Sequence, residues 1–180
     1  PYFYKKTTIR TLMNLLKQTE GSEFETVATN MVVIIKYIWE KLSTEDRYFI
    51  GKNYAQYQNE GNKKCEKTIY SVLISVKGFD YVPETIRSTT FIEAAKKVIS
   101  AHFGMNNFYT EPSAVSSLNS LGNNIPKPAI GIVIEAMLLV KTGNFYGRSW
   151  GAQSYADDIL ERVSSQQWKY YLEMYLRYSV

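Results

Sequence analysis

Apolar residues recur along most of this chain at the three- and four-residue spacing of an amphipathic helix. Residues 7–18 form the first such segment, and Gly21 follows it as a natural helix end. The segment 22–42 carries the longest apolar stripe, and Ser22 and Glu25 at its start have the spacing of a capping box. The members of this stripe are Phe24, Val27, Ala28, Met31, Ile35, Ile38 and Leu42.

The helical spacing continues to the end of the chain. Ser43 and Asp46 are spaced to open a helix over 44–58, which the polar residues 59–62 break. The β-branched residues of 68–76 leave a strand as the alternative to a helix there. Further helices are predicted over 63–78, 88–104, 128–141, 154–163 and 165–178.

Small polar residues mark several helix ends. Gly78 is the expected C-cap of the helix before it, and Ser164 with Gln167 is expected to start the last helix. Residues 105–128 are rich in Asn, Ser, Pro and Gly, so they offer the best place for an internal boundary. One short helix is expected there after Pro112, because proline fits a first helical turn.

These patterns predict an all-α fold, an irregular multi-helix bundle of about seven to nine helices. The length of 180 residues and the apolar share of 45% are enough for one hydrophobic core. We therefore expect a single helical domain over residues 1–180, with 105–128 as the alternative subdomain boundary.

Charge and composition narrow the class of protein. The net charge of +4 permits an anionic partner but is modest for a dedicated nucleic-acid domain. The lone Cys65 excludes an internal disulfide and favours a reducing, cytoplasmic setting. The longest apolar run, 129–140, contains Glu135 and is about half a bilayer span, so no membrane insertion is expected. The first residue, Pro1, suggests a processed chain or a piece of a longer one.

Motifs for catalysis, metals and cofactors are missing from the sequence. His102 is the one histidine, so a nucleophile triad would have to use it, and it is expected instead near a helix C-terminus. No phosphate-binding glycine loop occurs. Asp157 and Glu161 share a helical face that could hold Mg²⁺, but acids near a helix start also stabilise its dipole. We expect no catalytic residue, no cofactor and no metal.

One acid and one aromatic loop form an alternative site. Glu135 is expected to be buried among apolar neighbours and to pair with Arg148, from the loop 143–155. Gly143 is expected to end the preceding helix in the left-handed conformation, and Trp150 to fold back on the bundle. Ser149 or Ser154 is expected to cap the helix that follows. An enzyme with a site near Glu135, Arg148 and this loop is the alternative function.

Two sets of side chains favour binding over catalysis. Lys63, Lys64 and Lys67 lie together with Tyr70 one turn on, a combination that can hold phosphates and stack bases. The last helix carries the aromatic stripe Trp168, Tyr171 and Tyr175, and Tyr and Trp are enriched at protein interfaces. A solvated basic face and a helix central to the bundle are the structural alternatives. We therefore predict a non-catalytic helical interaction domain, with a protein partner or self-association, and with nucleic acid as a further candidate partner.

Overall fold

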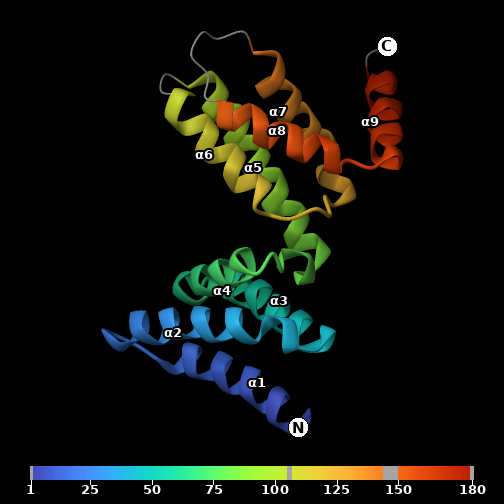
Figure 1. Ribbon diagram of the computed structural model, residues 1–180. Coiled ribbons are helices and arrows are strands. Elements are labelled where there is room, and N and C mark those ends of the chain that lie inside the picture. The colour runs from blue at the N-terminus through green and yellow to red at the C-terminus, as the bar shows by residue number, and fades with distance from the viewer. Residues whose placement is uncertain (1, 105–106, 144–149, 179–180) are drawn as a thin grey trace. The chain divides into compact units, whose positions relative to one another are not determined.

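The computed structural model describes residues 2–104, 107–143 and 150–178, and side chains over a slightly smaller set. The described residues form nine α-helices and no strand, so the predicted all-α, multi-helix fold is confirmed (Figure 1). The alternative of a strand over 68–76 is wrong, since most of that segment lies in a helix.

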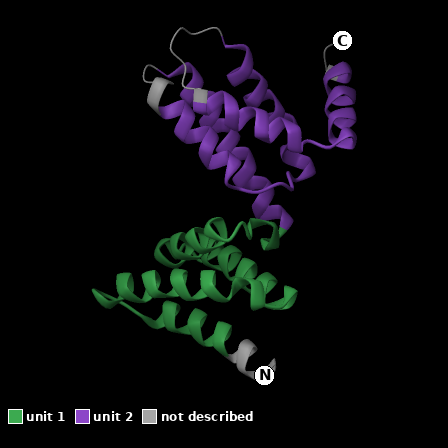
Figure 2. Cartoon of the chain, viewed as in Figure 1, with its two compact units in different colours: residues 1–83 green, residues 84–180 purple. Residues whose placement is uncertain are grey.

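The chain divides into two compact units, Pro1–Pro83 and Glu84–Val180 (Figure 2). Unit 1 contains four helices: α1 (Tyr2–Gln18), α2 (Glu23–Ile38), α3 (Thr44–Asn59) and α4 (Lys63–Ser75), with the 3₁₀ turns η1 (Trp39–Lys41) and η2 (Phe79–Tyr81). Unit 2 contains α5 (Glu84–Phe103), α6 (Asn107–Asn119), η3 (Lys127–Ala129), α7 (Ile130–Thr142), α8 (Trp150–Arg162) and α9 (Ser165–Tyr178).

The core of unit 1 follows the predicted stripe of α2. Phe24, Ala28, Met31 and Ile35 are buried, at the helical spacing that places them on one face. The helix α2 packs with α1 and α4, and α3 packs with α4 within the same unit. The apolar spacing therefore predicted the inner face of this helix correctly.

One corner of unit 1 depends on two glycines. A side-chain carbon on Gly51 of α3 would lie inside van der Waals contact with the carbonyl oxygen of Tyr81, so α3 and η2 approach backbone to backbone. A side-chain carbon on Gly78 would lie 2.7 Å from Cη2 of Trp39. Arg47 completes the corner by donating to the Tyr81 hydroxyl at 3.1 Å and to the Trp39 carbonyl at 3.0 Å.

The helix α7 is the centre of unit 2. It packs against α5 and α8, and α6 packs against both of those helices. The buried residues of α7 are Ile130, Val133, Ile134, Ala136, Met137 and Val140. The sequence predicted a helix over 128–141, and the burial of these residues confirms that it belongs to the core.

The predicted helix starts have mixed outcomes. The Ser43 hydroxyl accepts from the backbone N–H of Asp46 at 3.1 Å, as expected. Ser164 and Gln167 form a reciprocal box, each side chain accepting from the other's backbone N–H. Ser22 makes no cap hydrogen bond because its own backbone is already helical, with φ of −70° and ψ of −20°. Ser154 is not a cap, since it lies inside α8.

The predicted helix ends need two corrections. Lys77, with φ of 52°, takes the left-handed conformation that was expected of Gly78. Gly78, with φ of −100°, instead provides room for the Trp39 ring. Gly143 is extended, with φ of −69° and ψ of 112°, so the left-handed conformation expected of it is wrong.

The segment 105–128 belongs entirely to unit 2. Its helix α6 begins at Asn107, earlier than predicted, and Pro112 lies inside it. The change between the two units instead follows Pro83, whose preceding residue is biased away from helix. A single domain over the whole chain stays a prediction.

Candidate interaction surfaces

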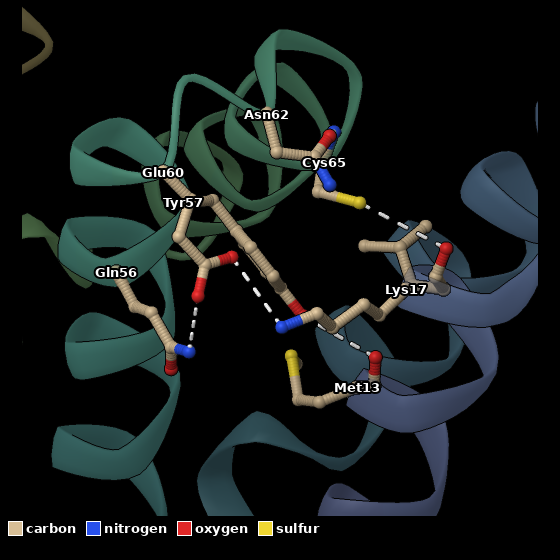
Figure 3. Close-up of polar contacts among 8 residues, drawn as sticks. Met13, Lys17, Gln56, Tyr57, Glu60, Asn62 and Cys65 are labelled. Atoms are coloured by element: carbon tan, nitrogen blue, oxygen red, sulfur yellow. Dashed lines mark hydrogen bonds and ion pairs between the residues drawn. The ribbon is translucent and has the colours of Figure 1, made fainter.

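A polar cluster fastens the C-terminal end of α1 to α3 and α4 (Figure 3). The Tyr57 hydroxyl donates to the carbonyl of Met13 at 3.3 Å, and the Cys65 thiol lies 3.8 Å from the carbonyl of Leu16. The carbonyl of Leu16 lies in the last turn of α1, where carbonyls have no partner within the helix, so the Cys65 thiol supplies one in the interior. Tyr57 and Cys65 are 1% and 2% exposed, which makes the cluster structural.

The titration of this cluster argues against catalysis. Burial raises the pKa of Tyr57 to about 12. Burial also raises the pKa of the Cys65 thiol above its ordinary value. Because the thiolate is the nucleophile, a buried thiol that stays protonated is inert. The expectation that no residue here acts as a nucleophile therefore stands as a prediction with a physical reason.

His102 lies in the last turn of α5, as expected, but its partner was missed. Its Nδ1 atom lies 2.6 Å from the carboxylate of Glu111 on α6, and the two side chains are 5% and 2% exposed. Nothing in the sequence singled out Glu111, because the turn between two helices sets this nine-residue separation. The pair therefore lies in the interior of unit 2, where it joins α5 to α6.

No group of three His, Cys, Asp or Glu side chains in the described parts could hold a metal ion. Asp157 forms an ion pair of 2.7 Å with Lys141. Because α8 begins at Trp150, its first turn contains no acid, so the expectation that Asp157 and Glu161 lie near a helix start is wrong.

No α-helix found in the described ranges combines the length and the apolar character that crossing a bilayer requires.

The alternative site around Glu135 needs a correction. Glu135 is exposed on the outer face of α7, together with Leu138, so the expected burial is wrong. The core-facing stripe runs through Val133, Ile134 and Met137, and an acid between these positions points outward. Arg148 and most of the aromatic loop, residues 144–149, lie outside the described residues, as does the side chain of Trp150. The Glu135–Arg148 pair stays a prediction.

The three predicted lysines do come together. Lys63, Lys64 and Lys67 line one groove of about 390 Å³ between α2 and α4. Tyr70 is absent from its lining: its ring packs instead on Tyr54 and Phe79, with centroids 6.0 and 6.1 Å away. The structure therefore separates the lysines from the aromatic ring that was expected to stack a base beside them.

The helix α9 is fastened at its start. Gln167 donates to the carbonyl of Ile125 at 3.0 Å, and the Lys127 ammonium lies 4.8 Å from the centroid of the Tyr170 ring. The Tyr171 hydroxyl has a raised pKa, chiefly because of burial and secondly because of Glu135 on α7. The first half of α9 thus packs on unit 2.

The second half of α9 is exposed to solvent. Every residue from Leu172 to Arg177 is exposed, including Leu172 at 52%, Tyr175 at 56% and Leu176 at 66%. Trp168, Tyr171 and Tyr175 follow one another as a chain of rings, with centroids 6.1 and 6.3 Å apart. The structural alternative, a helix central to the bundle, does not hold for this half of α9. Figure 1 shows α9 at the edge of its unit.

Comparison with known proteins adds nothing to these surfaces. No protein-family model, no curated protein and no solved structure matches this chain. The groove of unit 1 and the exposed half of α9 are the two candidate interaction surfaces.

Proposed function

We propose that this chain is a non-catalytic helical interaction domain that associates with a second copy of itself through α9. The observation that carries the proposal is the exposure of Leu172, Tyr175 and Leu176 on one stripe of this helix. Large contiguous apolar patches are rare on the surface of monomeric proteins and mark interaction sites. A half-helix with most of its surface exposed is also marginal by itself, so a partner would stabilise it.

A second copy is the partner that the stripe suits. Leu172, Tyr175 and Leu176 follow Trp168 at helical spacing, which is the seam that two packed helices share. In a two-fold pair each patch meets the same patch, and an apolar stripe is complementary to itself. Glu173 and Arg177 lie outside the stripe, so pairing would bury no unpaired charge.

Light scattering on the purified chain, combined with size-exclusion chromatography over a wide concentration range, tests the proposal. The expected mass rises from one chain to two. Leu176→Glu should keep the chain monomeric, because it places a charge in the pair. Val33→Glu is the matched control: Val33 is 62% exposed, but it lies on α2 of the other unit.

A chain that stays monomeric at every concentration, or equal disruption by both variants, would overturn self-association. A salt series with a labelled oligonucleotide addresses the other predicted partner. Tight binding at low salt that weakens as salt increases would move the function to nucleic acid. Circular dichroism of both variants confirms that the helices persist.

A further inference from the structure

The α2–α4 groove of unit 1 is a second surface, independent of α9. Its floor contains Phe24 and Ala28, which are 5% and 7% exposed, and its side includes the half-buried Val32. Lys63, Lys64 and Lys67 form the wall on α4. The groove thus joins an apolar strip to a row of ammonium groups.

The charges of the groove are unbalanced. Lys63 pairs with Glu66 at 2.8 Å, and the Lys64 ammonium lies over the Phe24 ring, 5.7 Å from its centroid. Lys67 is exposed and has no ion-pair partner among the residues that the structure describes. Glu25 is the one acid in the described lining. A ligand with carboxylates would therefore meet lysines whose charge is only partly compensated.

Two of the lysines also lie at the amino end of a helix, where a positive charge is destabilising. Lys63 and Lys64 are the first two residues of α4, directly after its N-cap Asn62. The amino end of a helix carries partial positive charge, so acids stabilise it and cations destabilise it. A negatively charged partner in the groove would relieve this repulsion.

The class of anion follows from the rest of the lining. Single-stranded nucleic acid is held largely by rings on which its bases stack, but Tyr70 packs inward and Phe24 is buried beneath Lys64. An amphipathic helix would place apolar side chains against Val32 and carboxylates beside the lysines. We infer that the α2–α4 groove binds an acidic amphipathic helix of a partner protein, held by Lys64, Lys67 and Val32.

Fluorescence anisotropy tests this with a labelled peptide that has leucines on one helical face and glutamates on the other. The full chain should bind it, and the affinity should fall as salt increases. Lys64→Glu with Lys67→Glu should weaken binding by about tenfold or more, since two attractions become repulsions. Lys96→Glu with Lys97→Glu makes the same charge change at two exposed lysines of α5 and should leave the affinity within about twofold.

Two further readouts separate binding from folding. The free chain with Lys64→Glu should melt at a temperature equal to or above that of the wild type, because a cation leaves the helix start. Lys64→Ala with Lys67→Ala should weaken peptide binding in the same direction but less. Val32→Ser should weaken it without changing the salt dependence.

Failure to bind the acidic peptide would overturn the inference, as would equal losses in the groove and α5 variants. Tighter binding of a labelled single-stranded oligonucleotide than of the peptide would also overturn it, in favour of nucleic acid. All these variants leave α9 unchanged, so light scattering still reports on self-association separately.

Discussion

His102 and Glu111 share a hydrogen bond of 2.6 Å that joins the end of α5 to α6 in the interior of unit 2. Removing one member of a buried hydrogen bond costs about 1–3 kcal/mol, because the desolvated polar atom of the other loses that bond. We expect Glu111→Ala to lower the free energy of unfolding by about 2–3 kcal/mol, measured by urea denaturation.

Glu93→Ala is the control for this pair. Glu93 also contacts a cation, Lys96 at 3.0 Å, but both side chains are 57% exposed. Exposed pairs contribute about 0–1 kcal/mol, so this change should hardly move the urea midpoint. Equal effects of the two substitutions would show that the buried pair does not stabilise unit 2.

Two glycines inside helices should respond in opposite directions to alanine. Gly51→Ala would force Tyr81 or α3 to move, because the new carbon meets a backbone oxygen. Gly131 lies in α7, and a new carbon there would meet open space beyond its own helix and chain neighbours. Thermal melting should show a lower midpoint for Gly51→Ala, whereas Gly131→Ala should gain about 0.5–1 kcal/mol from helix propensity. A higher midpoint for Gly51→Ala would contradict the close contact with η2.

The buried Tyr57 hydroxyl should make unit 1 sensitive to alkali. Burial raises the Tyr57 pKa from 10.0 to about 12, so the folded chain keeps a proton that the unfolded chain loses. The contribution of this hydroxyl to the free energy of unfolding is therefore complete below pH 10. It falls by about 2–3 kcal/mol as the pH increases towards 12. Urea midpoints across this range should fall less steeply for Tyr57→Phe than for the wild type. Parallel pH profiles would show that Tyr57 is not responsible.

Cys65 should react with a thiol reagent only after unfolding. The side chain is 2% exposed and its thiol pKa is raised by burial, so both access and thiolate content are low. A colorimetric thiol assay at mildly alkaline pH should show slow labelling of the native chain and rapid labelling in denaturant. Rapid labelling of the native chain would place the thiol at the surface.

The features predicted correctly from the sequence are those that depend on the residues of a single helix. The stripe of α2 and the box of Ser164 and Gln167 were predicted because helical spacing and capping are local properties. The gathering of three lysines was also local, since they share the start of α4.

Features that depend on a neighbouring helix were missed. Glu111 gave no signal because its partner lies across a turn, on α5. Glu135 was expected inside, but α7 presents Val133 and Met137 to the core, and this rotation depends on α5 and α8. Tyr70 turned inward because Tyr54 and Phe79 provide a place for its ring.

The corner formed by Gly51 and Gly78 limits how unit 1 can change over evolutionary time. Elsewhere in the core, a larger side chain at one position can be compensated by a smaller side chain at the position opposite. The residues can therefore change while the total volume of the core stays the same. At Gly51 the opposing surface is main chain, which no substitution can trim. A distant descendant of this chain should therefore retain Gly51 after most of the surrounding side chains have been exchanged, whereas Gly78 can change together with the Trp39 side chain that it faces.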